Sequence, residues 1–264
     1  MRTSGHTIGF VPTMGALHAG HAELISVSSK DNTQTVVSIF VNPTQFNVQS
    51  DFEKYPRSFD SDVKVAQAHG ATAIYAPSSA AMYPEGYRTY IEPGASSDPM
   101  EGEGRPGHFR GVATIVIKLL NAVLPHHAYF GQKDFQQLAV VKETVHSLDM
   151  DVRIVGVPTV REPDGLALSS RNVRLSADAR EQASCIYRAL TTARTLFQNG
   201  ERNAITLEEA ASQVLSSASL CTIEYVTVSE SQTLMPQTQA TKNSVICIAC
   251  WFDDVRLIDN LLLQ

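Results

Sequence analysis

The 264-residue sequence predicts an α/β protein, with a doubly wound parallel sheet in its N-terminal part and a smaller α+β domain after it. Two observations support this prediction. Strand-like and helix-like segments alternate as far as residue 157, which is the pattern of a parallel sheet wrapped by helices. Beyond residue 160 two helices come first and strands follow, so we expect a domain of residues 161–264 after one of residues 1–160.

Apolar runs that end at proline, glycine or polar residues predict the elements of the first domain. We expect strands at 7–12, 34–41, 73–76, 128–130 and 152–157. We expect one helix to begin over 22–28, and others at 60–69, 111–123 and 136–148. The run 34–41, QTVVSIFV, is β-branched and almost wholly apolar, which is typical of a strand buried on both faces.

The second domain is predicted from the same kinds of pattern. We expect helices at 177–198 and 207–218, strands at 222–228, 244–252 and 256–259, and loops at 199–203 and 236–243. The four cysteines, Cys185, Cys221, Cys247 and Cys250, are expected to be reduced. Cys247 and Cys250 form a C-x-x-C, but on a strand this spacing directs them to opposite faces, so we predict no metal site.

Charge and hydropathy limit the classes of partner. The net charge of −6 argues against a nucleic-acid partner, since nucleic-acid-binding proteins need a basic face. No apolar run approaches the roughly 18 residues of a membrane span. The segment 1–9 lacks the apolar core of a signal peptide, so we expect a cytoplasmic protein.

The segment 12–21, PTMGALHAGH, joins the first strand to the first helix, where open α/β sheets bind ligands. His18 and His21 are three residues apart, so the first helical turn places them on one side. N–H groups at a helix start favour an anion, and the two imidazoles can donate hydrogen bonds to phosphate oxygens in a transition state. The alternatives are a chance H-x-G-H and a metal site, for which no third ligand is nearby in sequence.

The segment 42–47, NPTQFN, directly follows the buried strand. Pro43 ends that strand, which leaves Gln45 at the carboxyl edge of the sheet. A neutral amide there can both donate to and accept from a small polar substrate. The alternative is a plain turn.

The segment 101–111, EGEGRPGHFRG, combines glycines with the charged side chains of Glu101, Arg105, His108 and Arg110. A glycine-rich loop with cationic residues is a plausible phosphate contact. The alternative is a solvated loop that carries charges.

The segment 130–138, FGQKDFQQL, again follows a strand and opens a helix. Lys133 is a compact, mobile cation suited to phosphates. Asp134 lies near the helix start, where it can cap the helix or accept from a ribose hydroxyl, and Gln137 is one helical turn beyond Lys133. Lys133 and Asp134 are otherwise ordinary exposed charges.

The segment 168–172, LSSRN, offers two hydroxyl groups and an arginine on a loop that enters the second domain. Such a loop can close over a triphosphate. Taken alone the motif is weak, because S-S-R occurs often by chance. Together with the other segments it describes one nucleotide site with a carboxylate pocket beside it.

These segments have the order and approximate spacing seen in the family of pantothenate synthetases, which the chain resembles from about residue 9 to residue 260. The resemblance rests on PTMGALHAGH, SIFVNPTQF, EGEGRPGHFRGV, YFGQKDFQQL, DGLALSSRN and RLIDN. It implies a Rossmann-like domain, ATP as a substrate accompanied by Mg²⁺, and a homodimer. It also implies two steps: pantoate and ATP give pantoyl adenylate and pyrophosphate, and β-alanine then gives pantothenate and AMP. Relatives usually carry a further helix before the first strand, whereas little chain precedes Gly9 here.

The resemblance also implies roles for individual residues. His18, His21 and Lys133 are the implied catalytic residues, while Gln45 and Gln137 are the implied pantoate- and β-alanine-binding residues and would hold pantoate. Tyr55 belongs to a mobile flap, and the 101–108 region is a supporting or interface segment. The implied ATP-binding residues are Met14, Gly15, Ala16, Leu17, His18, Ala19, Gly20, His21, Gly131, Gln132, Lys133, Asp134, Val160, Leu168, Ser169, Ser170 and Arg171.

Two other functions compete with this one. A nucleotidyltransferase would transfer AMP or CMP to a phosphorylated acceptor and stop there, and it shares the H-x-G-H motif. The neutral pair Gln45 and Gln137 favours a small hydroxy acid, since a phosphorylated acceptor would need arginines. A non-catalytic nucleotide-binding module would not need both histidines together with Lys133.

Overall fold

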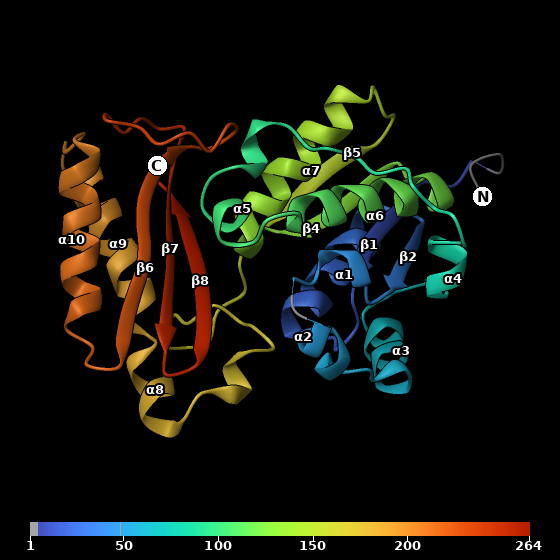
Figure 1. The fold of residues 1–264 in the computed structure, drawn as a ribbon, viewed down its shortest axis with the longest axis horizontal. Helices are drawn as coiled ribbons and strands as arrows, with labels where there is room; N and C mark the ends of the chain where they lie inside the picture. Colours follow the sequence, from blue (N-terminus) through green and yellow to red (C-terminus); the bar gives the residue numbers. More distant parts are fainter. Residues whose placement is uncertain (1–4, 48) are drawn as a thin grey trace. The chain divides into compact units, whose positions relative to one another are not determined.

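The computed structural model describes residues 5–47 and 49–264, and the chain separates into two compact units (Figure 1). One unit contains Met1–Gln132 and Gln136–Pro158. The other contains Thr159–Gln264 together with the short segment Lys133–Phe135. The chain therefore enters the second unit for three residues, returns to the first unit at Gln136, and leaves it finally after Pro158.

The first unit is built on a five-stranded parallel sheet with the strand order β3-β2-β1-β4-β5. The strands are β1 (Ile8–Thr13), β2 (Gln34–Ile39), β3 (Ala73–Tyr75), β4 (His127–Gly131) and β5 (Arg153–Val157). These are the five predicted strands, and the doubly wound α/β class is confirmed. The central strand is β1, which pairs with β2 on one side and with β4 on the other.

Helices cover both faces of this sheet because adjacent strand residues point in opposite directions. Phe10 packs into a core that contains the apolar residues of α6 (His108–Val123) and α7 (Phe135–Ser147). Its neighbour Val11 packs into a second core with α1 (Ala19–Asp31) and α3 (Phe59–Ala68). The unit also contains short helices that the pattern did not predict, namely α2 (Gln49–Lys54), α4 (Ser79–Met82) and α5 (Glu101–Gly104).

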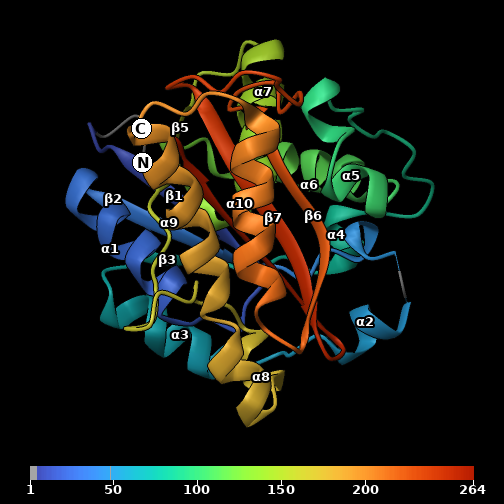
Figure 2. The ribbon, with the colours of Figure 1, turned by 90° about the vertical axis from the view of Figure 1, so that its left-hand side faces the viewer.

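The second unit is a three-stranded antiparallel sheet with helices on one face. The strand order is β6 (Cys221–Glu230), β7 (Ser244–Phe252) and β8 (Val255–Leu262). In Figure 2, α9 (Cys185–Gln198) and α10 (Ala204–Ser216) lie across this sheet. The central strand β7 is buried throughout except at Trp251.

One predicted helix of this unit is wrong. The segment 177–198 forms two helices, α8 (Ala177–Gln182) and α9, which are separated at Ala183 and Ser184. At the break the N–H of Ile186 donates to the carbonyl oxygen of Ala183, three residues back rather than four. No proline or glycine occurs there, so the sequence contains no local signal for the break.

The four cysteines are free thiols. Cys250 belongs to the core beneath the helices, where Cys185 and Cys221 also pack. A hydrogen bond to Cys221, together with burial, raises the pKa of the Cys185 thiol. A buried, protonated thiol is a weak nucleophile, so this group is part of the packing.

None of the helices in the described part of the chain combines the length and the apolar character that crossing a membrane requires.

Candidate functional site

The topology of the first unit creates a switch point at the carboxyl edge of its sheet. The order of the strands reverses between β1 and β4, because β2 and β3 lie on one side of β1 while β4 and β5 lie on the other. Open α/β sheets bind ligands at such a switch point. The H-x-G-H segment follows β1, Gln45 follows β2 and Gln137 follows β4. Three neighbouring strands therefore direct these segments to the same edge.

His18 and His21 cap the start of α1 reciprocally. His18 is the N-cap residue, and its Nδ1 accepts from the N–H of Gly20 over 3.1 Å. The Nδ1 of His21 accepts from the N–H of His18 over 3.3 Å, and the ring centroids are 4.2 Å apart. An imidazole nitrogen that accepts a hydrogen bond carries no proton, so the proton of each neutral ring is on Nε2. The local backbone thereby makes both rings Nε2–H donors.

A buried carboxylate holds the loop between β1 and α1. The side chain of Asp62, on α3, is only 1% exposed and accepts from the N–H groups of Ala16 and Leu17 over 3.0 and 2.8 Å. Gly15 has a φ of +82°, and a Cβ there would lie 2.9 Å from the Asp62 carboxylate. Glycine is favoured at that position because the positive φ strains other residues, and a side chain there would also press on the Asp62 carboxylate.

These contacts occupy several N–H groups in the loop and at the start of the helix. The N–H groups of Ala16, Leu17, His18 and Gly20 already donate to Asp62 or to the two imidazoles. Attraction of an anion by the remaining N–H groups at the helix start stays a prediction. Asp62 is also a residue that the sequence analysis missed, because it lies 46 residues from Ala16 and no local pattern connects them.

Replacing Asp62 by asparagine is expected to lower the free energy of unfolding by about 1–3 kcal/mol, the usual cost of an unsatisfied buried group. An amide can accept from one of the two loop N–H groups but turns its own NH₂ toward the other. Urea denaturation measures the change. The matched control is Asp60→Asn, an exposed carboxylate on the same helix, for which at most about 1 kcal/mol is expected. Equal losses in the two variants contradict the assignment.

Gln45 is buried, with 9% of its surface exposed, at the end of a short 3₁₀ turn, Pro43–Gln45. Its Oε1 accepts from the amide of Asn42 over 3.1 Å, and its Nε2 contacts the sulfur of Met14 at 2.9 Å. The structure therefore brings together Met14, predicted for ATP, and Gln45, predicted for pantoate. The alternative of a plain turn accounts for the backbone but not for the burial of this side chain.

Asn42 orients Gln45 and was missed from the sequence, although an asparagine before a proline is a recognisable turn-capping signal. Its Nδ2 also donates to the carbonyl oxygen of Gly111, while its Oδ1 accepts from the hydroxyl of Tyr83 over 2.7 Å. Burial raises the pKa of Tyr83 to about 12, so this hydroxyl remains a donor at neutral pH.

The 101–111 segment also contacts the backbone of Gln45. The carbonyl oxygen of Gln45 accepts from Nδ1 of His108 over 2.9 Å and from Arg105 over 3.4 Å. Arg110 forms an ion pair with Glu92 and stacks on the ring of Tyr90 at 4.1 Å. These cationic side chains contact protein groups, which favours the supporting role that the family resemblance implied.

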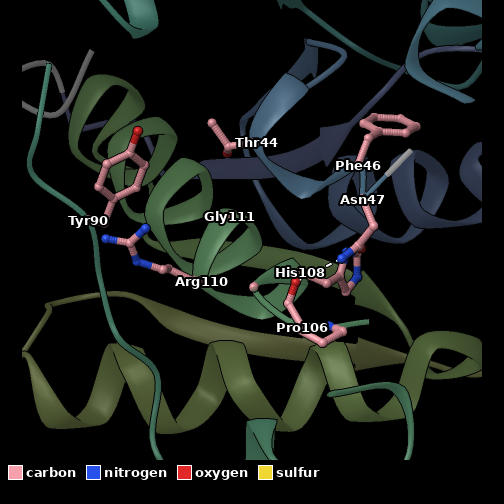
Figure 3. A pocket seen from close by; sticks show the side chains of 9 residues that line it. Thr44, Phe46, Asn47, Tyr90, Pro106, His108, Arg110 and Gly111 are labelled. Atoms are coloured by element: carbon pink, nitrogen blue, oxygen red, sulfur yellow. Dashed lines mark hydrogen bonds between the residues drawn. The ribbon is translucent and has the colours of Figure 1, made fainter. Parts of the chain in front are cut away.

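A cavity of about 230 Å³ lies between this segment and the residues around the Pro43–Gln45 turn (Figure 3). Beside it, the amide of Asn47 donates to the carbonyl oxygen of Pro106 over 2.8 Å. The lining residues are Thr44, Phe46, Asn47, Tyr90, Pro106, Gly107, His108, Arg110 and Gly111. None of the residues predicted to bind ATP or pantoate is among them, so this cavity adjoins the Gln45 segment without being the predicted site.

The second unit carries the other predicted ATP-binding segments. Lys133 lies partly buried in a short 3₁₀ turn, with its Nζ 3.7 Å from Asp134. Leu168 donates its N–H to the carbonyl oxygen of Val160 over 3.0 Å. Val160 and the loop 168–171, all predicted to bind ATP, therefore belong to one hairpin. At its end, Arg171 donates to the carbonyl oxygen of Arg256.

The remaining predicted residues lie in the first unit. Gly131 and Gln132 follow directly from the end of β4, and Gln137 lies partly buried in the first turn of α7. The convergence of Gln137 on Gln45 stays a prediction. Tyr55 packs edge-on against Phe46, so it lies beside the segment of Gln45.

A parallel sheet with polar segments gathered at its switch point, and with a histidine-capped helix there, defines the class of Rossmann-like nucleotide-binding α/β proteins. Comparisons with known proteins narrow this class. Residues 1–262 match the family model described as pantoate-beta-alanine ligase. The chain is 47% identical to the pantothenate synthetase of Thermotoga neapolitana, over 100% of this chain and 94% of that protein. It is 48% identical to that of Geobacter sulfurreducens, over 99% and 93%.

The solved structures agree with the sequence comparisons. The pantothenate synthetase of Thermus thermophilus superimposes with a TM-score of 0.93 at 42% identity, covering 98% of this chain and 94% of that one. A pantoate-beta-alanine ligase from Francisella tularensis gives a TM-score of 0.77 at 35% identity, with 98% and 90% covered. The chain belongs to the pantoate-β-alanine ligase family, and it is an enzyme of the ligase class.

Proposed function

We propose that the enzyme condenses (R)-pantoate with β-alanine to form pantothenate, in two steps that consume ATP and pass through pantoyl adenylate. The observation that carries this proposal is the reciprocal histidine cap at the switch point. This cap presents two preorganised Nε2–H groups as hydrogen-bond donors, so neither histidine has to act as a general base. Such donors suit a step in which negative charge develops on phosphate oxygens.

In the first step a carboxylate oxygen of pantoate attacks the α-phosphorus of ATP, and the bond to the β-phosphate oxygen breaks to release pyrophosphate. His18 and His21 donate to the phosphoryl oxygens as their charge rises. Lys133 offsets the charge of the departing phosphates. The family resemblance assigns the rest of the nucleotide to the loop 14–21, Gly131–Asp134, Val160 and the loop 168–171.

In the second step the amine of β-alanine attacks the acyl carbon of the adenylate. The bond between that carbon and the phosphate oxygen breaks, AMP leaves, and the amine gives up a proton as the amide forms. Gln45 and Gln137 hold the pantoyl group throughout. The fixed contacts of Gln45 to Asn42 and Met14 hold its amide in one orientation, which is the condition for specific recognition of a small hydroxy acid.

The Francisella tularensis relative was crystallised with β,γ-ATP and β-alanine, which supports ATP and β-alanine as substrates here. Among the residues that the structure describes, no group of three or more His, Cys, Asp or Glu side chains could hold a metal ion. Mg²⁺ commonly binds through substrate phosphates and water. We propose that Mg²⁺ would accompany ATP, held by the substrate phosphates, and would neutralise phosphate charge there. A homodimer, a cytoplasmic location and the lack of a nucleic-acid partner remain predictions.

A coupled assay tests the function directly. We expect pyrophosphate release from ATP to require pantoate, and AMP release to require both pantoate and β-alanine. Pyrophosphate release that does not depend on pantoate contradicts the proposal. Transfer of a nucleotide onto a phosphorylated acceptor would instead establish the nucleotidyltransferase function, and ATP binding without turnover would establish the non-catalytic module.

The pocket for the acid is tested by Gln45→Ala. We expect pantoate affinity to fall by about 1–3 kcal/mol, the cost of leaving buried polar partners without their hydrogen bonds, while ATP affinity stays almost unchanged. Calorimetric titration of each ligand measures both. Asn47→Ala is the matched control, because its amide lies in the same segment but binds Pro106. If ATP affinity falls as much as pantoate affinity, Gln45 supports the fold or the nucleotide instead.

A further inference from the structure

The family motif at 256–260, RLIDN, lies on β8 and has no role in the mechanism above. Two adjacent polar residues of this motif are nevertheless buried, Asp259 with 4% and Asn260 with 7% of their surface exposed. The side-chain amide of Asn260 donates to the carbonyl oxygen of Lys133 over 2.9 Å, across 127 residues of sequence. The three-residue segment Lys133–Phe135 belongs to the same compact unit as β8.

Asp259 anchors the neighbouring segment of the same unit. Its carboxylate accepts from both terminal nitrogens of Arg161, over 2.6 and 3.0 Å. Arg161 also donates to the carbonyl oxygen of Gly165 and stacks on Tyr187 at 4.2 Å. Arg161 directly follows Val160, in the hairpin that leads to the S-S-R loop.

The strand β8 therefore binds two segments of the same unit, the turn that contains Lys133 and the hairpin that contains Arg161. Successive side chains on a strand point to opposite sides, so Asp259 and Asn260 reach different neighbours. Asn260 binds the backbone of Lys133, and Asp259 binds Arg161, the residue that follows Val160. In addition, the N–H of Asn260 lies 2.8 Å from the Asp259 carboxylate, which links the two contacts.

We propose that Asn260 is a positioning residue for Lys133. A lysine side chain is long and flexible, so the place where its backbone is anchored decides which phosphate oxygen its ammonium group reaches. The amide of Asn260 provides that anchor from β8. The inference rests on the proposed function, because it concerns the adenylate-forming step in which Lys133 acts.

Two variants remove the anchor in different ways. Asn260→Asp keeps the shape of the side chain but replaces the NH₂ donor by an oxygen, and Asn260→Ala removes the donor without adding a charge. We expect each variant to lower the rate of pantoate-dependent pyrophosphate release by about 10- to 100-fold, the scale of a misplacement near 1 Å. The rate with preformed pantoyl adenylate and β-alanine should stay near that of the wild type. If Asn260→Asp does not fold because its aspartate is buried, the measurement on Asn260→Ala alone tests the proposal.

A double-mutant cycle separates positioning from a general structural role. If Asn260 acts through Lys133, then adding Asn260→Ala to Lys133→Ala should cause little further loss. Asn243→Asp is the control for the added charge, because Asn243 is exposed in a loop of the same unit. Equal losses in both half-reactions, additive losses in the cycle, or wild-type rates in both Asn260 variants overturn the proposal. If the wild type itself releases no pyrophosphate with pantoate, the proposed function fails instead.

Discussion

Replacing His18 or His21 by alanine is expected to lower turnover by about 10²–10³-fold, the usual effect of removing one preorganised donor to a developing charge. ATP affinity should change far less, because the donors act on charge that rises in the transition state. Steady-state rates and ATP titration of each variant measure the two effects. Near-normal turnover in both variants contradicts the assignment.

The capping geometry requires a control for this experiment, because alanine at position 18 also removes a helix cap worth about 1 kcal/mol. His18→Asn separates the two roles. The asparagine carbonyl oxygen can replace Nδ1 as the acceptor of the Gly20 N–H, but the side chain has no group at the position of Nε2. We expect a protein as stable as the wild type with turnover as low as that of His18→Ala. Recovery of turnover in His18→Asn would mean that His18 serves α1 rather than the reaction.

Lys133→Ala is expected to lower the rate of adenylate formation by about 10²-fold or more, since it removes a full positive charge from the departing phosphates. The rate of amide formation should fall much less, because that charge leaves the site with pyrophosphate. Supplying preformed pantoyl adenylate should therefore restore most of the activity. Rapid-quench measurement of each half-reaction decides the matter.

The control for this variant is Lys142→Ala, which removes an exposed lysine from α7 and should leave both half-reactions unchanged. Equal losses of both half-reactions in Lys133→Ala would show that Lys133 maintains the fold or binds the acid. Arginine is not an adequate replacement, because its planar group is larger and directs its donors differently.

The architecture was largely predictable from local patterns. The run 34–41 is apolar on both of its faces, and only a strand covered on both sides tolerates that, so β2 and its parallel sheet followed. The polar segments were predicted to follow strands because proline and glycine mark where each apolar run ends. The family was predictable for another reason, since the joint order of six weak motifs is far more specific than any one of them.

Contacts between residues distant in sequence were not predictable in this way. The break between α8 and α9 leaves no mark in the sequence, because it depends on how Ala183 and Cys185 pack into the core of the second unit. Asp62 gave no signal either, and the RLIDN motif marked Asn260 without indicating its partner, since a side chain that serves a distant backbone group has no fixed spacing from it.

The amino-acid sequence by itself determined the strands of the parallel sheet, most of the long helices and the residue types that follow each strand, because periodicity and turn chemistry act over a few residues. Only the tertiary structure decided that β1 lies between β2 and β4, which creates the switch point. It also decided that Asp62 occupies the loop N–H groups and that Lys133 is anchored on β8. The physical reason is that strand order and long-range hydrogen bonds depend on the packing of whole elements, and that packing is not encoded in any short stretch of the chain.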